Sequence, residues 1–153
     1  MNDDLEGLTL ANWVGGIWFK YRRGVPLTGY EGALAHCMEF HKEWRSRWDS
    51  LGHSNDPELS RDVLHVHYDA MVKVQIDSDS PPEIRQFYNK LREKAFTEFE
   101  ALHTLIPPLT EALWMAKTKN EPFDNARYIQ LAKQYVDVAL MRPTSVRRGA
   151  DIR

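Results

Sequence analysis

The sequence predicts an all-α fold: an antiparallel bundle of about six helices forming one domain over residues 1–141. Apolar residues recur every three or four positions along most of the chain, which is the period of an amphipathic helix. Gly, Pro, Asn and Asp divide the chain into segments of helical length joined by short connections, and such connections favour antiparallel neighbours. With 153 residues, 42% of them hydrophobic, the chain is long enough to bury one sizeable core.

The first two helices are predicted over residues 4–22 and from Thr28 to the stretch "LGHSN". The apolar residues of the first are Leu8, Trp13, Ile17, Trp18 and Tyr21. The segment "RRGVPL" ends it. Thr28 and Glu31 then stand at the spacing of a capping box, in which each side chain accepts a hydrogen bond from the backbone amide of the other residue. The stripe of the second helix is Leu34, Met38, His41, Trp44 or Arg45, and Trp48.

A third helix is predicted to begin at Asp56 and Pro57 and to run toward Ile76. Aspartate is a good N-cap, and proline is tolerated at the first helical position because its missing amide has no helical partner there. The stretch "VKVQI", residues 72–76, alternates like a strand, so a short strand remains an alternative there.

The last three helices follow from proline and capping signals. Ser80 and Glu83 repeat the capping-box spacing, so a fourth helix is expected from Pro81 to about His103 or Ile106. Pro107–Pro108 removes two amide donors and predicts a break or a kink. Two more helices are expected over 109–118 and 125–140, followed by a basic flexible tail over 142–153.

Composition excludes several classes of protein. A net charge of −2 leaves no excess of Lys and Arg to neutralise phosphates, which disfavours a nucleic-acid partner. The acidic start "MNDDLEGLTL" does not resemble a signal peptide, and no apolar run is long enough for a membrane span. A single cysteine, Cys37, cannot form an internal disulfide. We expect a cytoplasmic protein that does not bind membranes.

The first candidate site lies in "LHVHYD", residues 64–69. His65 and Asp69 are four residues apart, so on a helix both leave the same face, which is the spacing of two metal ligands. A solvated His–Asp pair explains the same spacing. Helical projection places His67 on the more apolar face of the same segment, so periodicity does not choose between His65 and His67.

Two further histidines lie among apolar residues. His41 falls within the stripe of its helix, and a buried imidazole needs either a hydrogen-bond partner or a metal. His103 is similar, and Glu100 one turn earlier completes the E-x-x-H pair of di-iron carboxylate bundles. Only one such pair occurs, so a symmetric dinuclear site is not supported. Without a metal, His41 and His103 are core histidines whose rings hydrogen-bond to other protein groups.

From Trp13 to about Tyr135 the chain resembles a family of uncharacterised bacterial helical proteins, domain of unknown function 1841. The matching segments are "WFKYRRGVPL", "FHKEWR", "LHVHYDAMVKVQIDSDSPPEIR", "FEALHTLIP" and "EALWMAK". The most specific of them are Pro-Pro-x-Ile-Arg and Glu-x-x-Trp. The resemblance implies an all-helical fold in which histidines and carboxylates from three helices gather a metal.

Carried over residue by residue, the resemblance implies a reduced site. His41, His65 and His103 keep histidines of the family pattern, and Asp69 stands in place of another histidine. Four positions depart from the pattern: Arg45 replaces a histidine, Val74 a glutamate, Phe99 a histidine and Pro107 a glutamate. The remaining ligands suit one Zn, Fe, Mn or Cu ion.

Two hypotheses follow. In the first, the bundle binds one metal ion through His41, His65, Asp69 and His103, with Glu100 as a supporting or additional ligand; the site is structural, or it has an open position that makes the protein a metal-dependent enzyme. In the second, the family's site is lost and the protein is a metal-free interaction module, which binds a protein partner or a second copy through its Trp-rich helices and basic tail.

Overall fold

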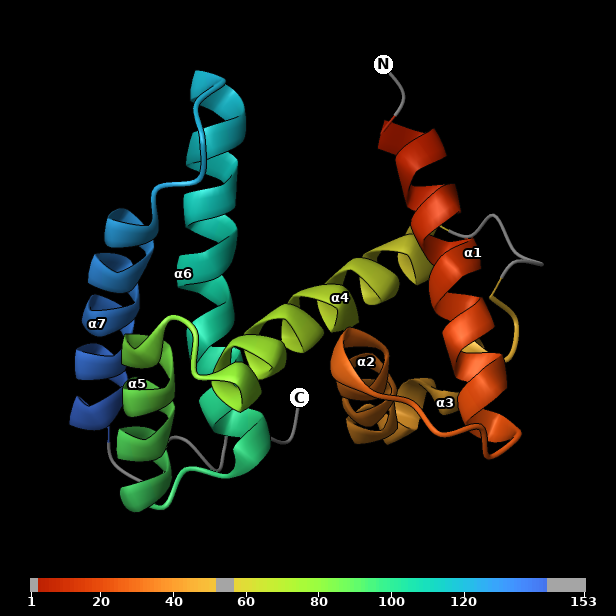
Figure 1. The fold of residues 1–153 in the computed structure, drawn as a ribbon, viewed down its shortest axis with the longest axis horizontal. Helices are drawn as coiled ribbons and strands as arrows, with labels where there is room; N and C mark the ends of the chain where they lie inside the picture. The colour runs from red at the N-terminus through yellow and green to blue at the C-terminus, as the bar shows by residue number, and fades with distance from the viewer. Residues whose placement is uncertain (1–2, 52–56, 143–153) are drawn as a thin grey trace. The chain divides into compact units, whose positions relative to one another are not determined.

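The computed structural model describes residues 3–51 and 57–142, and within these ranges all regular structure is helical. The helices are α1 (Asp3–Arg22), α2 (Gly29–Phe40), the 3₁₀ helix η1 (Lys42–Trp44), α3 (Arg45–Trp48), α4 (Pro57–Ser78), α5 (Pro82–Glu93), α6 (Glu98–Lys119) and α7 (Asn125–Met141). The predicted all-α fold is confirmed (Figure 1). Residues 72–76, for which a strand was an alternative, belong to α4.

The chain divides into two compact units, residues 1–74 and 75–153, with α4 running across the boundary in sequence. In the first unit α1, α2, α3 and most of α4 enclose one apolar core. Its buried residues include Val14, Ile17, Trp18, Leu34, Met38, Trp48, Val63, Val66 and Ala70. The α4 side chains of this set recur at the helical spacing that the sequence shows.

The second predicted helix is in fact interrupted at His41. Here α2 ends, η1 follows, and α3 completes the segment. A straight helix would place Trp48 about 15 Å along the axis from Met38, because each residue advances about 1.5 Å. Instead the chain turns back, Trp48 is buried, and its Nε1 donates a hydrogen bond of 3.1 Å to the carbonyl of Met38. Burial of this indole explains why the helix breaks.

The capping box predicted at Thr28 and Glu31 is not formed. Thr28 is the N-cap of α2, but its side chain makes no capping hydrogen bond. Glu31 instead lies 3.8 Å from the ammonium of Lys20 on α1. The N-cap predicted at Asp56 lies outside the described residues.

In the second unit α5, α6 and α7 pack side by side (Figure 1). Their buried residues include Ile84, Leu91, Leu102, Leu105, Leu109, Tyr128, Leu131 and Val136. Tyr128 also donates a 2.5 Å hydrogen bond to Oε1 of Gln75, at the end of α4.

The fourth predicted helix is also divided. α5 ends at Glu93 and α6 begins at Glu98, and between them Ala95 adopts a positive φ of 65°. The capping box of this region is formed by Thr97 and Glu100, not by Ser80 and Glu83: Thr97 Oγ1 accepts from the Glu100 amide at 3.1 Å, and Glu100 Oε1 accepts from the Thr97 amide at 3.0 Å. The predicted start at Pro81 is correct to within one residue, because α5 begins at Pro82, but the interruption between Glu93 and Glu98 was not predicted.

The break in the helix predicted at Pro107–Pro108 is wrong, whereas the kink, its alternative, stays a prediction. α6 continues through both residues to Lys119. Proline removes the amides that would bond the carbonyls one turn earlier, at a cost of about 3 kcal/mol or more for an interior position. Pro108 is buried together with Leu105 and Leu109, and this packing offsets the loss.

No helix among the described residues is long and apolar enough to cross a bilayer. The basic tail lies outside the described residues from position 143 onward. The single domain expected over 1–141 stays a prediction.

Candidate metal centre

Two helical segments of the first unit bring together His41, His65 and Asp69. His41 is the residue at which α2 ends, with φ −89° and ψ 66°, so its side chain leaves the turn rather than a helix. His65 and Asp69 lie one turn apart on α4 and leave the same face, as their spacing predicts. His41 and Asp69 are only 3% and 2% exposed, whereas His65 is half-buried.

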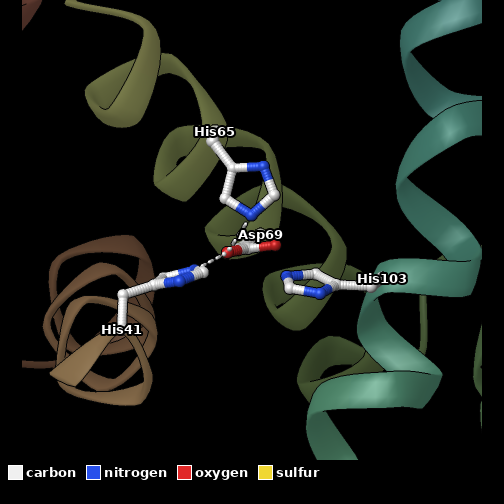
Figure 2. Close-up of side chains that lie close together, drawn as sticks. All are labelled: His41, His65, Asp69 and His103. Atoms are coloured by element: carbon white, nitrogen blue, oxygen red, sulfur yellow. Dashed lines mark hydrogen bonds and ion pairs between the residues drawn. The ribbon is translucent and has the colours of Figure 1, made fainter. Parts of the chain in front are cut away.

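The imidazoles of both histidines face the same carboxylate oxygen (Figure 2). Nε2 of His41 lies 3.0 Å from Oδ2 of Asp69, and Nε2 of His65 lies 3.4 Å from that same atom. The two rings stand edge to face, with centroids 5.0 Å apart and planes at 76°. One ligand atom from each of the three residues lies within 4.8 Å of the others.

These separations match those of donors around one metal ion. Donors bound at about 2.0–2.1 Å stand about 2.9 Å apart at a right angle and about 3.3 Å apart at the tetrahedral angle. The distance of 3.4 Å from His65 to Asp69 exceeds an ordinary hydrogen bond but suits two ligands of one ion. The donor types and the two distances from Oδ2 of Asp69 are therefore compatible with one metal ion.

Electrostatics favour a cation at this point. A carboxylate that is 2% exposed has lost most of its hydration, and burial of an ionised group is costly unless an opposite charge lies close to it. Neutral imidazoles supply no such charge, whereas a protonated imidazole or a bound cation does. A divalent ion bound by both Nε2 atoms and by Oδ2 would neutralise Asp69 and use all three donors.

Two neighbours of His41 were not predicted as part of the site. Oε1 of Glu43 lies 3.7 Å from Nδ1 of His41, on the side of the ring opposite to Asp69. Metal-binding histidines commonly direct their second ring nitrogen toward a carboxylate, a carbonyl or water. Trp44 lies against the flat face of the same ring. Glu43 follows His41 by two residues and carries no other sequence signal, whereas Trp44 belongs to the apolar stripe predicted for this segment.

Arg45 does not leave an uncompensated charge beside this group. Its Nη2 lies 3.2 Å from Oε1 of Glu39, so an anion accompanies this cation. The guanidinium is therefore compatible with a metal centre in the same unit.

His67 makes different contacts from its neighbour His65. The hydroxyl of Tyr30 hydrogen-bonds Nδ1 of His67, and Tyr30 stacks in turn on Trp13 with ring centroids 5.2 Å apart. Burial lowers the pKa of His67 and raises that of Tyr30, so both are neutral at neutral pH. His67 therefore belongs to the packing of α4 against α2.

His103 and Glu100, the other two predicted site residues, lie on α6 in the second unit. The ring of His103 packs against Phe99, with centroids 3.8 Å apart and planes at 68°. Glu100 closes the capping box described above, so one of its carboxylate oxygens is already used at the start of α6.

A comparison with known protein families gives a match over most of the chain. The family described as "Domain of unknown function (DUF1841)" matches residues 12–134, which include every residue of the candidate site. No curated protein and no solved structure matches the chain.

Proposed function

The chain belongs to the DUF1841 family, a domain of unknown function, and we propose that it binds one metal ion through His41, His65 and Asp69. The observation that carries this proposal is the approach of two imidazole Nε2 atoms, at 3.0 and 3.4 Å, to one oxygen of a buried carboxylate. Imidazole and carboxylate together suit Zn, Fe, Mn or Cu, and the absence of a thiolate from the set disfavours a purely soft-metal site.

On the family resemblance, we add His103 to this proposal as a fourth ligand. It keeps a histidine of the family pattern, and a third imidazole would complete the four-coordinate shell that zinc adopts in closed sites. Glu100 supports it indirectly, because the capping box fixes the first turn of α6, from which His103 follows one turn later.

The number of protein ligands determines what the ion does. Four protein donors close the shell and make the ion structural, whereas three leave a position for a small molecule or water, on which the ion acts as a Lewis acid. X-ray absorption of the loaded protein at the metal edge measures this number: a shell of protein nitrogen and oxygen without exchangeable water indicates a structural ion.

Elemental analysis of protein purified without a His tag or chelator tests the proposal. We expect about one metal ion per chain in the wild type, directly or after reconstitution with Zn²⁺, and a large loss in His65→Ala and Asp69→Asn. His36→Ala is the matched control, because His36 is exposed and lies outside the candidate set. Loading of the control should equal that of the wild type.

Substoichiometric metal that does not rise on reconstitution would overturn the proposal. It would favour the metal-free interaction module instead. That alternative predicts that His65→Ala and Asp69→Ala together leave the stability unchanged, whereas charge substitutions in residues 44–48 abolish association with a partner.

A further inference from the structure

Trp44 makes ring contacts with both histidines of the candidate centre. Its ring stacks on that of His41, with centroids 4.3 Å apart and planes only 12° from parallel. It also stands edge-on to His65, with centroids 5.8 Å apart and planes at 85°. A single side chain therefore touches both imidazoles that face Asp69.

The backbone holds Trp44 in this position. Its amide donates a 2.9 Å hydrogen bond to the carbonyl of His41, which closes the turn that begins η1. Its indole also meets the buried ring of Trp48 edge to face, with centroids 5.9 Å apart. Trp44 is thus anchored at both ends, by the turn and by the core, before it contacts the histidines.

His41 needs such support because it lies where α2 ends. A side chain within a helix is restricted by the preceding turn, whereas a residue in a turn is restricted mainly by what packs on it. Holding an imidazole in one rotamer costs conformational entropy, and a metal site whose ligands are already in place avoids this cost on binding.

We propose that Trp44 is a positioning residue of the metal site: by stacking on His41 and standing edge-on to His65 it keeps both Nε2 atoms directed at Asp69 and slows loss of the ion. This inference rests on the proposed metal binding. It assigns to Trp44 no contact with the ion itself. A flat aromatic ring is required, because an aliphatic side chain fills the space without fixing the plane of the imidazole.

Three substitutions separate stacking from simple burial. Trp44→Phe keeps a flat ring, Trp44→Leu keeps an apolar volume without one, and Trp114→Ala removes an indole that is 65% exposed on α6 as the matched control. The measurements are the rate at which a chelator removes Zn²⁺ and the visible absorption of the Co²⁺-substituted protein, whose intensity reports the geometry of the ligand shell.

The expected result is a release of Zn²⁺ about 10- to 100-fold faster in Trp44→Leu, the size of effect typical for residues that orient metal ligands. The Co²⁺ absorption of this variant should also change. Trp44→Phe should restore most of the slow release, and Trp114→Ala should match the wild type. Circular dichroism confirms that each variant is folded before the comparison.

Two outcomes contradict the inference in distinguishable ways. If the wild type binds Zn²⁺ and Trp44→Leu releases it at the same rate with the same Co²⁺ spectrum, the positioning role is wrong and the proposed metal binding stands. If the wild type binds neither Zn²⁺ nor Co²⁺, both proposals fail.

Discussion

At the scale of single residues, the structure separates two histidines that helical periodicity could not. His65 and His67 are two positions apart on α4, and each has apolar neighbours in projection. His65 faces the carboxylate of Asp69, whereas His67 is bonded to the hydroxyl of Tyr30. The choice depends on which residues of α2 and the following turn pack on each side of α4, and no local pattern contains that information.

The neutral pair of His67 and Tyr30 predicts a pH dependence of stability. Burial holds the pKa of His67 below its ordinary value near 6.5. As the pH falls through about 6.5 the unfolded chain binds a proton that the folded chain does not, so the free energy of unfolding decreases until the lower folded pKa is reached. The stability associated with the neutral His67 is therefore fully present above about pH 6.5.

Urea unfolding at about pH 7.5 and about pH 5.5, with chelator present, measures this effect against His67→Gln, whose side chain does not titrate. We expect the wild type to lose more stability between the two pH values than the variant. An equal loss in both proteins would contradict the assignment of His67 as a buried neutral residue.

At the scale of helices, local patterns identified nearly every helical segment but misplaced three boundaries. The period of apolar residues was sufficient for α1, α4 and α7. The break at His41 was not predictable because the bond from Trp48 to Met38 that accompanies it spans ten residues. The continuity of α6 through Pro107–Pro108 was not predictable either, because tertiary packing overrides the loss of two amide donors.

For the candidate site, too, the local features were predictable from the sequence and the tertiary contact was not. Spacing alone placed His65 and Asp69 on one face, and position in an apolar stripe indicated that His41 is buried and needs a partner, which the structure confirms in Asp69. That His41 and the α4 pair meet is a tertiary contact. It followed only from the family resemblance.

The capping box at the start of α6 gives a second prediction. Thr97→Ala removes a hydroxyl that accepts from the amide of Glu100, and loss of such a cap costs about 1 kcal/mol. We expect urea unfolding of Thr97→Ala to show a free energy of unfolding that is lower by this amount. Ser80→Ala should change the free energy of unfolding by a few tenths of a kcal/mol at most, because no capping box forms at Ser80. Equal effects of the two substitutions would contradict the assigned boundary.

At the scale of the whole molecule, the proposal links metal binding to stability. An ion that binds the folded chain and not the unfolded one stabilises it by about 2.7 kcal/mol at a free concentration one hundredfold above the Kd, equivalent to about 5–10 °C in Tm for a chain of this size. We expect Zn²⁺ to raise the Tm of the wild type by this order and to leave that of Asp69→Asn nearly unchanged. A similar rise in both proteins would indicate binding elsewhere.

His103 adds a prediction of its own, because the family resemblance supplies it as a ligand. His103→Ala tests this assignment. We expect weaker Zn²⁺ binding and a smaller rise in Tm than in the wild type, with His36→Ala again as control. Unchanged affinity would restrict the site to His41, His65 and Asp69.

The most direct test of the metal centre is anomalous scattering from crystals of protein loaded with Zn²⁺, recorded on both sides of the zinc absorption edge. The account predicts one strong anomalous peak per chain, within bonding distance of Nε2 of His41, Nε2 of His65 and an oxygen of Asp69. A fully loaded crystal with no peak between these three side chains, or with the ion bound elsewhere, would contradict it.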